Sequence, residues 1–535
     1  MFNFNDFMME RSILIPLTCL GCFWCVISAV PVVYAPNRLT FLEEHHSINP
    51  IRYTQELREG DKSLQDKDHY LYSSTNKQTI ILYEKSLVMF LRKLFSYGQG
   101  TLKASRITCH FCELVASQIH NMMANNASWD DIKWVVGTSC KLLKQETPRV
   151  CDGLVEEFAP EVLTVLANTN FSSEELCSFL LGPECAGPDV PTYHWNVTFP
   201  PVPQPPPVYP TPPKVRTLRL LRTHFPISFD YIIWTGDLPP HNVWNQSRTD
   251  QVTTLKTIVG LFHKYFPNKP VFPSLGNHES SPVNSFPPPY VTNNESIAWL
   301  YDALADQWKQ WLPTGALETV RWGAYYVTSP FPGLRIISLN MNYCNNQNWW
   351  MLLNSTDPAD ELQWLISVLQ AAENDGVKVH ILGHIPPGID DCLKIWSWNY
   401  YNIISRYQNS IAGQFFGHTH FDSFSVFYDI ETLKIPISVA YVAPSVTPYT
   451  DLNMGYRIYT VDGNYQGSSF QVLDHETYFM NLSRANEEGK MTWEFEYSAK
   501  VRLSICNNPF YFCFTERFLL SCLINWLVCI MLCKY

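Results

Sequence analysis

The sequence predicts an α/β protein joined to a small, separate, cysteine-rich helical region. Four apolar runs can be interpreted as buried strands, and each is followed at once by a short polar segment that begins with glycine. Stretches with helical spacing, such as Ala359–Ala372, alternate with these runs, which is the pattern of α/β domains. Nearer the N-terminus, residues 106–187 hold six cysteines, and the apolar residues between the first of them recur with the period of an amphipathic helix.

Length and composition indicate a folded protein with more than one core. The chain has 535 residues, more than a single domain usually holds. Hydrophobic residues make up 46% and charged residues 16%, a globular rather than a disordered composition. The net charge of -11 gives no overall basic surface for nucleic acid. An anionic ligand would therefore need a local positive charge to attract it, such as a bound metal ion.

Residues 1–35 have the features of a secretory signal. Arg11 precedes the apolar run 12–29, and small residues follow it. A membrane anchor is the alternative for this run. Sixteen cysteines and seven Asn-x-Ser/Thr sequons agree with passage through an oxidising lumen, so we predict a secreted or lysosomal glycoprotein. The sequons lie at Asn126, Asn170, Asn196, Asn245, Asn294, Asn354 and Asn481. Residues 36–104 show no recognisable chemistry, and their role is unknown.

Residues 105–187 open with Cys-x-x-Cys, which is found in zinc and redox sites. No second Cys-x-x-Cys follows, and the context is secretory, so disulfides are favoured; six cysteines allow fifteen pairings, and composition does not choose among them. The pattern resembles the saposin B family. That resemblance implies three nested disulfides, namely Cys109–Cys185, Cys112–Cys177 and Cys140–Cys151. The module would be a disulfide-held bundle with a thin core, either presenting an apolar helix face to lipid or serving a purely structural role.

A proline-rich segment separates this region from the remainder of the chain. Residues 188–214 contain eleven prolines, which favour polyproline II and make a semi-rigid spacer. From residue 215 to residue 500 the only cysteines are Cys344 and Cys392, so we expect these two to form a disulfide.

The four polar segments carry the chemistry. Asp, Asn and His supply oxygen and nitrogen ligands for a metal such as zinc, and the preceding glycine lets the backbone turn sharply. In α/β sheets, sites lie at the carboxyl ends of strands, where all four segments fall. One Gly-His pair alone is more often an ordinary turn, so the prediction depends on all four together. The segments are Gly236-Asp237 with His241 four residues later, Gly276-Asn277-His278-Glu279, Gly383-His384 and Gly417-His418-Thr419-His420.

In this order the segments resemble the calcineurin-like metallophosphoesterases. The resemblance implies a two-sheet α/β sandwich flanked by helices over residues 215–500, with a pair of zinc ions. It assigns Asp237 as the bridge between the ions, His420 to the first ion, and three further ligands to the second ion. Those three are Asn277, His384 and His418.

His241 and His278 match histidines of that family that do not bind metal. The resemblance implies that they stabilise charge in the transition state and protonate the leaving group. For His278, orientation of a metal ligand is the alternative, and Glu279 is expected to have such an orienting role.

The sequence departs from the family at the first metal ion. The family supplies an Asp-x-His at the end of the first strand of this domain, but only Asp230 carries a carboxylate between Pro191 and Asp237, and His224 is the only nearby substitute for the histidine. Asp237 and His420 alone fall short of the three protein ligands that catalytic zinc usually has. We therefore expect one well-liganded zinc site, weak occupancy of the other, and reduced turnover.

The order of saposin-like module, proline linker and phosphoesterase is similar to the acid sphingomyelinase family, as are Asn284–Pro289, Ser338–Asn342 and Ser397–Tyr401. This implies zinc-dependent hydrolysis of sphingomyelin to ceramide and phosphocholine at a lipid surface by a monomer, with no nucleic acid partner. The alternatives are a phosphodiesterase for soluble diesters such as nucleotides, and a lipid-binding protein that has lost activity. Residues 501–535 leave the resemblance and include sixteen largely apolar residues near their end. These are interpreted either as a membrane anchor of marginal length or as the removable tail of a lipid-anchor signal.

Overall fold

The computed structural model describes residues 104–142, 146–181, 194–205, 217–219, 229–449 and 451–503. The predicted signal segment, most of the N-terminal segment, Cys185, His224 and the apolar tail after residue 503 lie outside the described residues. Among the helices within these ranges, none has the length and apolar character needed to cross a bilayer.

Four helices form the cysteine-rich region, α4 (Ala104–Ala124), α5 (Trp129–Leu142), α6 (Pro148–Ala167) and α7 (Ser173–Leu181). The side chain of Thr147 caps α6 by accepting a hydrogen bond from the backbone N–H of Val150, and Pro148 occupies the first turn, where no N–H is needed.

Disulfides join these helices in pairs. Cys112–Cys177 links α4 to α7, and Cys140–Cys151 links α5 to α6. These are two of the three pairs that the resemblance implied, and Cys185 of the third lies outside the described residues. The identity of this region as a saposin-like module stays a prediction.

A six-stranded sheet lies at the centre of the α/β region. Its strand order is β4 (Tyr326–Phe331), β5 (Leu334–Ser338), β6 (Lys378–Leu382), β7 (Ile411–Phe416), β9 (Pro436–Val442) and β8 (Ser423–Tyr428). The four inner strands run parallel, and β4 and β8 run antiparallel at the two edges. Inner parallel strands are covered on both faces, which explains two of the four apolar runs interpreted as buried strands, those of β6 and β7.

Two further sheets complete the strands of the described residues. β1 (Thr217–Arg219), β10 (Met454–Asp462), β11 (Val472–Met480) and β12 (Trp493–Ser498) form an antiparallel sheet in that order. β2 (Ile232–Trp234) and β3 (Val271–Pro273) form a short parallel pair. The hydroxyl of Tyr326 on β4 donates to the carbonyl of Pro273 at 2.8 Å, which fastens this pair to the central sheet.

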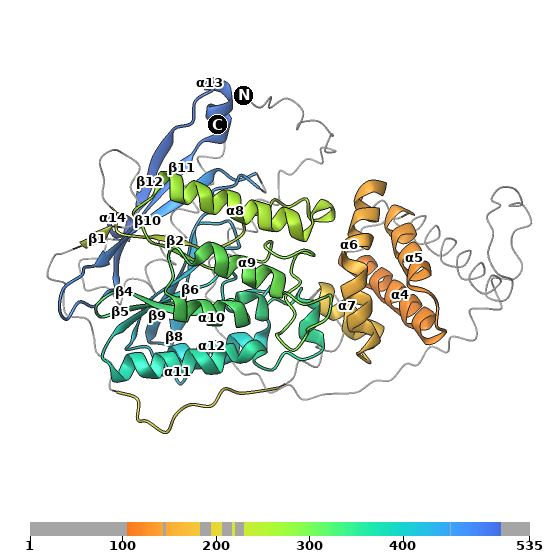
Figure 1. Cartoon of the computed structure of the whole chain (residues 1–535), viewed down its shortest axis with the longest axis horizontal. Coiled ribbons are helices and arrows are strands. Elements are labelled where there is room, and N and C mark those ends of the chain that lie inside the picture. Colours follow the sequence, from red (N-terminus) through yellow and green to blue (C-terminus); the bar gives the residue numbers. More distant parts are fainter. Residues whose placement is uncertain are drawn as a thin grey trace, which may run out of the picture. The chain divides into compact units, whose positions relative to one another are not determined.

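Helices cover the sheets, as Figure 1 shows, with α9 lying between α8 and α10. Their bounds are α8 (Arg248–Tyr265), α9 (Ala298–Trp308), α10 (Thr314–Gly323), α11 (Glu361–Asn374), α12 (Lys394–Arg406), α13 (Leu482–Glu488) and α14 (Ala499–Leu503). Short 3-10 turns lie at η4 (Val243–Asn245), η5 (Met341–Tyr343), η6 (Trp349–Leu352) and η7 (Pro358–Asp360). α11 begins two residues later than the expected helix, after η7, and buries Leu362, Leu365, Ile366 and Leu369 at helical spacing.

Alternate residues of β6 and β7 enter different hydrophobic cores. Ile381 and Phe416 belong to the core shared with α11 and α12, whereas Leu382 and Phe415 belong to the core shared with α9 and α10. Successive side chains of a strand point to opposite faces, so each strand is held from both sides. The carboxyl ends of β6 and β7, where two polar segments begin, are therefore fixed firmly in place.

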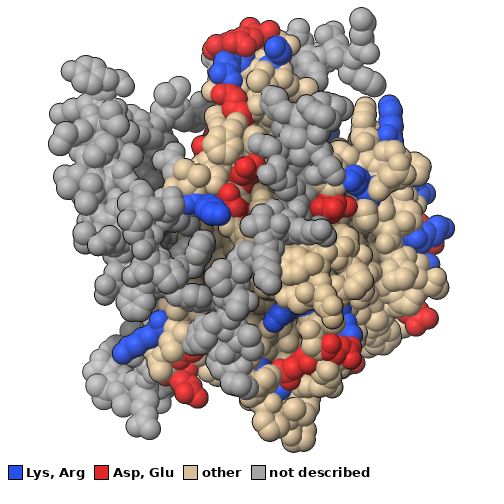
Figure 2. All heavy atoms as spheres, turned by 90° about the vertical axis from the view of Figure 1, so that its left-hand side faces the viewer, with Lys and Arg blue, Asp and Glu red and all other residues tan. Residues whose placement is uncertain are grey.

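Surface charge is mixed in sign. On the face shown in Figure 2, Lys and Arg side chains lie among Asp and Glu side chains over a largely uncharged surface. Salt screens exposed charges that lie more than about 8 Å apart at physiological ionic strength. Long-range attraction of a charged substrate to this face is therefore weak.

Candidate active site

Each polar segment directly follows its strand. Asp237 and Asn277 come shortly after the parallel strands β2 and β3, and His384 and His418 come shortly after the parallel strands β6 and β7. Parallel neighbours end at the same edge of a sheet, so each pair of strands brings its two side chains together. The two pairs belong to different sheets that meet here, and residues as far apart in the sequence as 237 and 418 converge.

Two glycines allow this convergence. A Cβ at Gly236 would lie 2.4 Å from the backbone nitrogen of Gly276, and a Cβ at Gly276 would lie 2.2 Å from Oδ1 of Asp237. Gly236 also has a φ of 95°, which other residues rarely adopt. The strand ends can approach this closely only without side chains at these two positions.

Four ligand atoms face one another at the centre of the site. Nε2 of His384 lies 3.0 Å from Oδ2 of Asp237 and 3.0 Å from Oδ1 of Asn277. Nδ1 of His418 lies 3.0 Å from Oδ1 of Asn277 and 3.2 Å from Nε2 of His384. The ligand atoms of Asp237, His384 and His418 all lie within 4.8 Å of one another. Tetrahedral zinc with bonds of ~2.0 Å sets its ligands ~3.3 Å apart, so these residues fit a divalent metal.

The charges within the cluster also suit a cation. Burial acts to raise the pKa of Asp237, but adjacent His384 and His278 outweigh it and hold that pKa well below its ordinary value. Nδ1 of His384 lies 2.6 Å from the carbonyl oxygen of Thr235, to which it donates. In the neutral ring this hydrogen bond places the proton on Nδ1, so that Nε2 faces the cluster with a free lone pair. Without a metal ion, burial acts to lower the pKa of His384, but the charge of Asp237 outweighs it and raises that pKa, so His384 and Asp237 attract each other as an ion pair. A bound cation would take the place of that proton between the carboxylate and Nε2.

Three further histidine rings meet beside the cluster. The ring centroid of His241 lies 4.2 Å from that of His278 and 5.5 Å from that of His420. Burial, followed by the charges of His278 and His420, lowers the pKa of His241 to about 4. Burial also lowers the pKa of His278 and His420. The ring of Tyr449 stacks on His241 at a centroid distance of 3.5 Å.

The five predicted metal ligands do not form one cluster. Among the described residues, the three-residue group of potential ligands consists of Asp237, His384 and His418, completed by the amide of Asn277. His420 lies on the side of His241 instead. This arrangement agrees with the assignment of His420 to a separate first ion, and that assignment stays a prediction.

Glu279 supports the backbone beside Asp237. Its Oε1 accepts a hydrogen bond from the backbone N–H of Leu238 at 3.0 Å, whereas its buried Oε2 has no hydrogen-bond partner among the described residues. Burial, followed by the charge of Asp237, raises the pKa of Glu279 to about 8. An unpartnered carboxylate oxygen beside a second carboxylate is a further feature that a cation would stabilise.

Sequence reasoning missed the residues that orient Asn277. The amide nitrogen of Asn277 donates to Oδ1 of Asn284 at 2.9 Å, and Asn345 donates to the same oxygen at 2.9 Å. The first bond fixes the amide so that Oδ1 of Asn277 faces the two histidines. The signal available in the sequence was the density of asparagines between residues 340 and 348.

Comparison with known proteins identifies the family. Residues 214–422 match the profile of the calcineurin-like phosphoesterase family. Sphingomyelin phosphodiesterase from Bos taurus is 45% identical over 469 residues, which cover 75% of this chain and 74% of that protein. The chain belongs to the sphingomyelin phosphodiesterase family. Sphingomyelin phosphodiesterase from Homo sapiens is 42% identical over 484 residues, with 79% and 75% of the two chains covered.

More distant relatives share a smaller part of the chain. Cyclic GMP-AMP phosphodiesterase SMPDL3A from Homo sapiens is 38% identical over 284 residues, or 50% of this chain and 59% of that protein. A dimetal phosphatase from Danio rerio covers 46% of this chain at 14% identity with a TM-score of 0.31, too low to support an argument. Membership of the sphingomyelin phosphodiesterase family confirms the predicted α/β phosphoesterase fold and the prediction of a phosphoric diester hydrolase.

The structure also has the disulfide expected in this phosphodiesterase domain, between Cys344 and Cys392. Of the seven sequon asparagines, Asn481 is half-buried, and its side-chain oxygen caps α13 by accepting from the N–H of Arg484 at 3.0 Å. The other six are exposed, namely Asn126, Asn170, Asn196, Asn245, Asn294 and Asn354. All seven stay predicted glycosylation sites.

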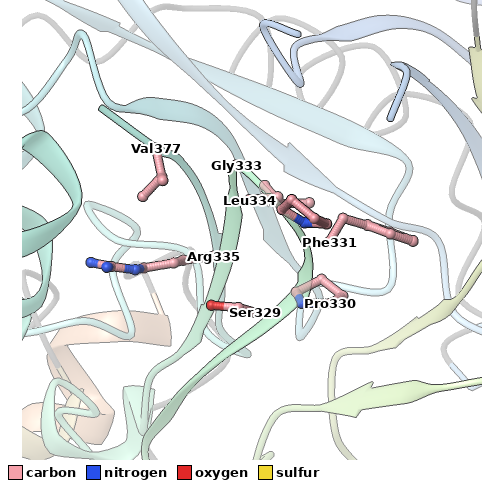
Figure 3. A pocket seen from close by; sticks show the side chains of 8 residues that line it. Ser329, Pro330, Phe331, Gly333, Leu334, Arg335 and Val377 are labelled. Carbon is pink, nitrogen blue, oxygen red and sulfur yellow. The ribbon is translucent and has the colours of Figure 1, made fainter. Parts of the chain in front are cut away.

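A separate hollow lies away from this site. It has a volume of about 350 Å³ and is lined by the β4–β5 turn together with Arg335 and Val377 (Figure 3). These residues lie at the amino ends of β5 and β6, whereas His384 and His418 follow the carboxyl ends of β6 and β7. The hollow is therefore at the opposite edge of the sheet and has no part in the metal cluster.

Proposed function

We propose that this chain hydrolyses sphingomyelin to ceramide and phosphocholine, using zinc held by Asp237, Asn277, His384 and His418. The observation that carries the proposal is the convergence of these four side chains, with neighbouring ligand atoms 3.0 to 3.2 Å apart. A calcineurin-like phosphoesterase domain uses divalent metal, and the choice of zinc follows from the two imidazole ligands.

Bound zinc would act as a Lewis acid toward the phosphoryl oxygens and lower the pKa of a coordinated water. The protein residues provide the remaining chemistry. Asp237 contributes the negative charge that retains the cation, and Asn284 turns the amide oxygen of Asn277 toward it. The rings of His241 and His278 lie with their centroids 4.2 Å apart, and a protonated imidazole at this place can donate its proton to the departing ceramide alkoxide. Because the pKa of His241 is lowered to about 4, its protonated form is populated only at acidic pH.

We also infer a lumenal location and contact with a lipid surface. Three disulfides and six exposed sequons support passage through an oxidising compartment. On α5, Trp129 and Trp134 are 49% and 51% exposed, and exposed tryptophans favour the interface between water and lipid. The helical region would thus hold the protein at the membrane that contains its substrate, as a monomer.

The test is release of phosphocholine from vesicles that contain sphingomyelin, compared with hydrolysis of a soluble chromogenic phosphodiester. We expect the vesicles to be the better substrate and His384→Asn to abolish release together with bound metal. The matched control is His263→Asn, because His263 is exposed on α8 and has no place in the cluster. Vesicle binding without any phosphocholine release, at acidic pH and with added zinc, would overturn the proposal in favour of an inactive lipid-binding protein. Faster turnover of soluble diesters would favour the nucleotide-type alternative.

A further inference from the structure

His418 is held at both ring nitrogens. Nδ1 faces the cluster, 3.0 Å from Asn277 and 3.2 Å from His384. On the opposite side of the ring, Nε2 lies 3.1 Å from Oδ2 of Asp391. A carboxylate only accepts hydrogen bonds, so the proton of a neutral His418 ring belongs on Nε2. The lone pair is then on Nδ1, which is the nitrogen directed at the metal position.

The second histidine of the cluster has an equivalent arrangement with a different partner. His384 donates from Nδ1 to the backbone carbonyl of Thr235 and presents Nε2. A backbone carbonyl is fixed by the fold and cannot be removed by substitution. The partner of His418 is a charged side chain, which makes a stronger hydrogen bond and raises the basicity of the coordinating nitrogen. Of these two contacts, the one with Asp391 is therefore open to testing by mutagenesis.

The loop that carries Asp391 is fastened to a neighbouring segment. The adjacent Cys392 is joined to Cys344 by a disulfide. The backbone N–H of Asn346 donates to the carbonyl of Asp391 at 2.9 Å, and the backbone N–H of Leu393 donates to the carbonyl of Cys344 at 2.6 Å. These contacts fix the main chain on both sides of Asp391, so its carboxylate is positioned before any metal binds.

We propose that Asp391 is a positioning residue for the metal site, holding His418 in the tautomer and orientation that coordination requires. The inference rests on the proposed metal-dependent function and extends it to a residue outside the predicted ligand set. Asp391 is 44% exposed and His418 is 17% exposed, so the hydrogen bond lies at the rim of the site. Asp391 acts through His418 and not on the substrate.

The test compares three variants by affinity for zinc, measured by competition with a chromogenic chelator, and by the absorption spectrum of the Co²⁺-loaded protein. Asp391→Ala should weaken affinity by roughly 10- to 100-fold and alter the Co²⁺ spectrum, because loss of such a partner loosens the ligand. Asp391→Asn keeps an oxygen that accepts from Nε2 and should recover most of the affinity. Asp390→Ala is the matched control, because this substitution removes the same charge from the same loop and the Asp390 side chain is exposed.

Zinc affinity of Asp391→Ala within about twofold of the wild type would overturn the inference, as would an equal loss in Asp390→Ala. Should Asp391→Ala fail to fold, Asp391→Ser takes its place, because serine stays polar at the rim of the site but is too short to reach Nε2 of His418. Its zinc affinity must then fall by at least about tenfold below that of Asp391→Asn, and equal affinities of the two variants would overturn the inference. Because zinc affinity is measured without substrate, the test of Asp391 is separate from the test of sphingomyelin hydrolysis. A wild-type protein that binds zinc but releases no phosphocholine contradicts the proposed function and leaves the comparison of affinities intact.

Discussion

Glu161 on α6 provides a quantitative test of how burial controls stability. It is 1% exposed, and neither carboxylate oxygen has a hydrogen-bond partner among the described residues. Burial raises its pKa from 4.5 to about 8, and the charge of Glu295 acts in the same direction. The folded protein therefore binds this proton more tightly than the unfolded chain does. Stability contributed by the protonated group is complete below pH 4.5 and is lost progressively as the pH rises toward 8.

The size of the effect follows from the two pKa values. Between them, each pH unit lowers the free energy of unfolding by about 1.4 kcal/mol. From pH 4.5 to pH 7.5 the loss from this group approaches roughly 4 kcal/mol. Glu161→Gln has the shape of the protonated acid and cannot ionise. We expect the variant to match the wild type at pH 4.5 and to exceed its stability at pH 7.5 by up to that amount.

Urea unfolding followed by circular dichroism at several pH values between 4.5 and 7.5 measures this difference. Glu156→Gln is the matched control, because Glu156 lies on the same helix with its side chain exposed and pairs with Lys133 at the surface. A parallel decline of the wild type and Glu161→Gln across the whole pH range would refute the reasoning, since the buried carboxylate would then not be the titrating group.

Four other outcomes follow from the site and its surroundings. Removal of metal by a chelator should lower the free energy of unfolding by roughly 2.7 kcal/mol, compared with the protein in zinc at 100 times the dissociation constant. Elemental analysis should find one tightly held zinc per chain, and two tightly held ions would contradict the expectation that the first site is incomplete. Gly276→Ala should abolish metal binding, because its Cβ would lie 2.2 Å from Asp237; a wild-type metal content in this variant would contradict the packing argument. His241→Ala should lower kcat by ~10²- to 10⁴-fold with unchanged metal content, and a loss of metal would instead make His241 a ligand. Replacing both Cys344 and Cys392, which are 48 residues apart, by alanine should lower the free energy of unfolding by roughly 4 kcal/mol, and a change below about 1 kcal/mol would show that the reduced chain is already constrained.

The sequence pointed to four side chains that the structure does bring together, because strand ends have a simple geometry; that they bind metal stays a prediction. Asp237, Asn277, His384 and His418 each come shortly after a strand, and the parallel pairs β2–β3 and β6–β7 each bring two such residues to one edge. The position of His420, beside His241, depends on the path of a loop, which no periodicity in the sequence describes.

Asp391 could not be found in this way. It lies 27 residues before His418, and its contact depends on a loop fastened by the Cys344–Cys392 disulfide. The separate β2–β3 pair was also not predicted, since strands of three residues carry too little pattern to show which neighbours they join. What the sequence lacked in both cases was information on which distant segments contact each other.

Three residues of the site have a left-handed backbone conformation, which links the protein's activity to a cost in stability. Asp237, His418 and His420 have φ values of 61°, 67° and 63°, a conformation that is uncommon for residues other than glycine and that stores roughly 1 to 3 kcal/mol at each position. Glycine would relax the main chain at all three places while deleting the groups that the chemistry needs. Selection for heat tolerance alone would therefore favour glycine at these positions and yield more stable variants without activity. Directed evolution of this protein must accordingly measure turnover as well as stability in every round.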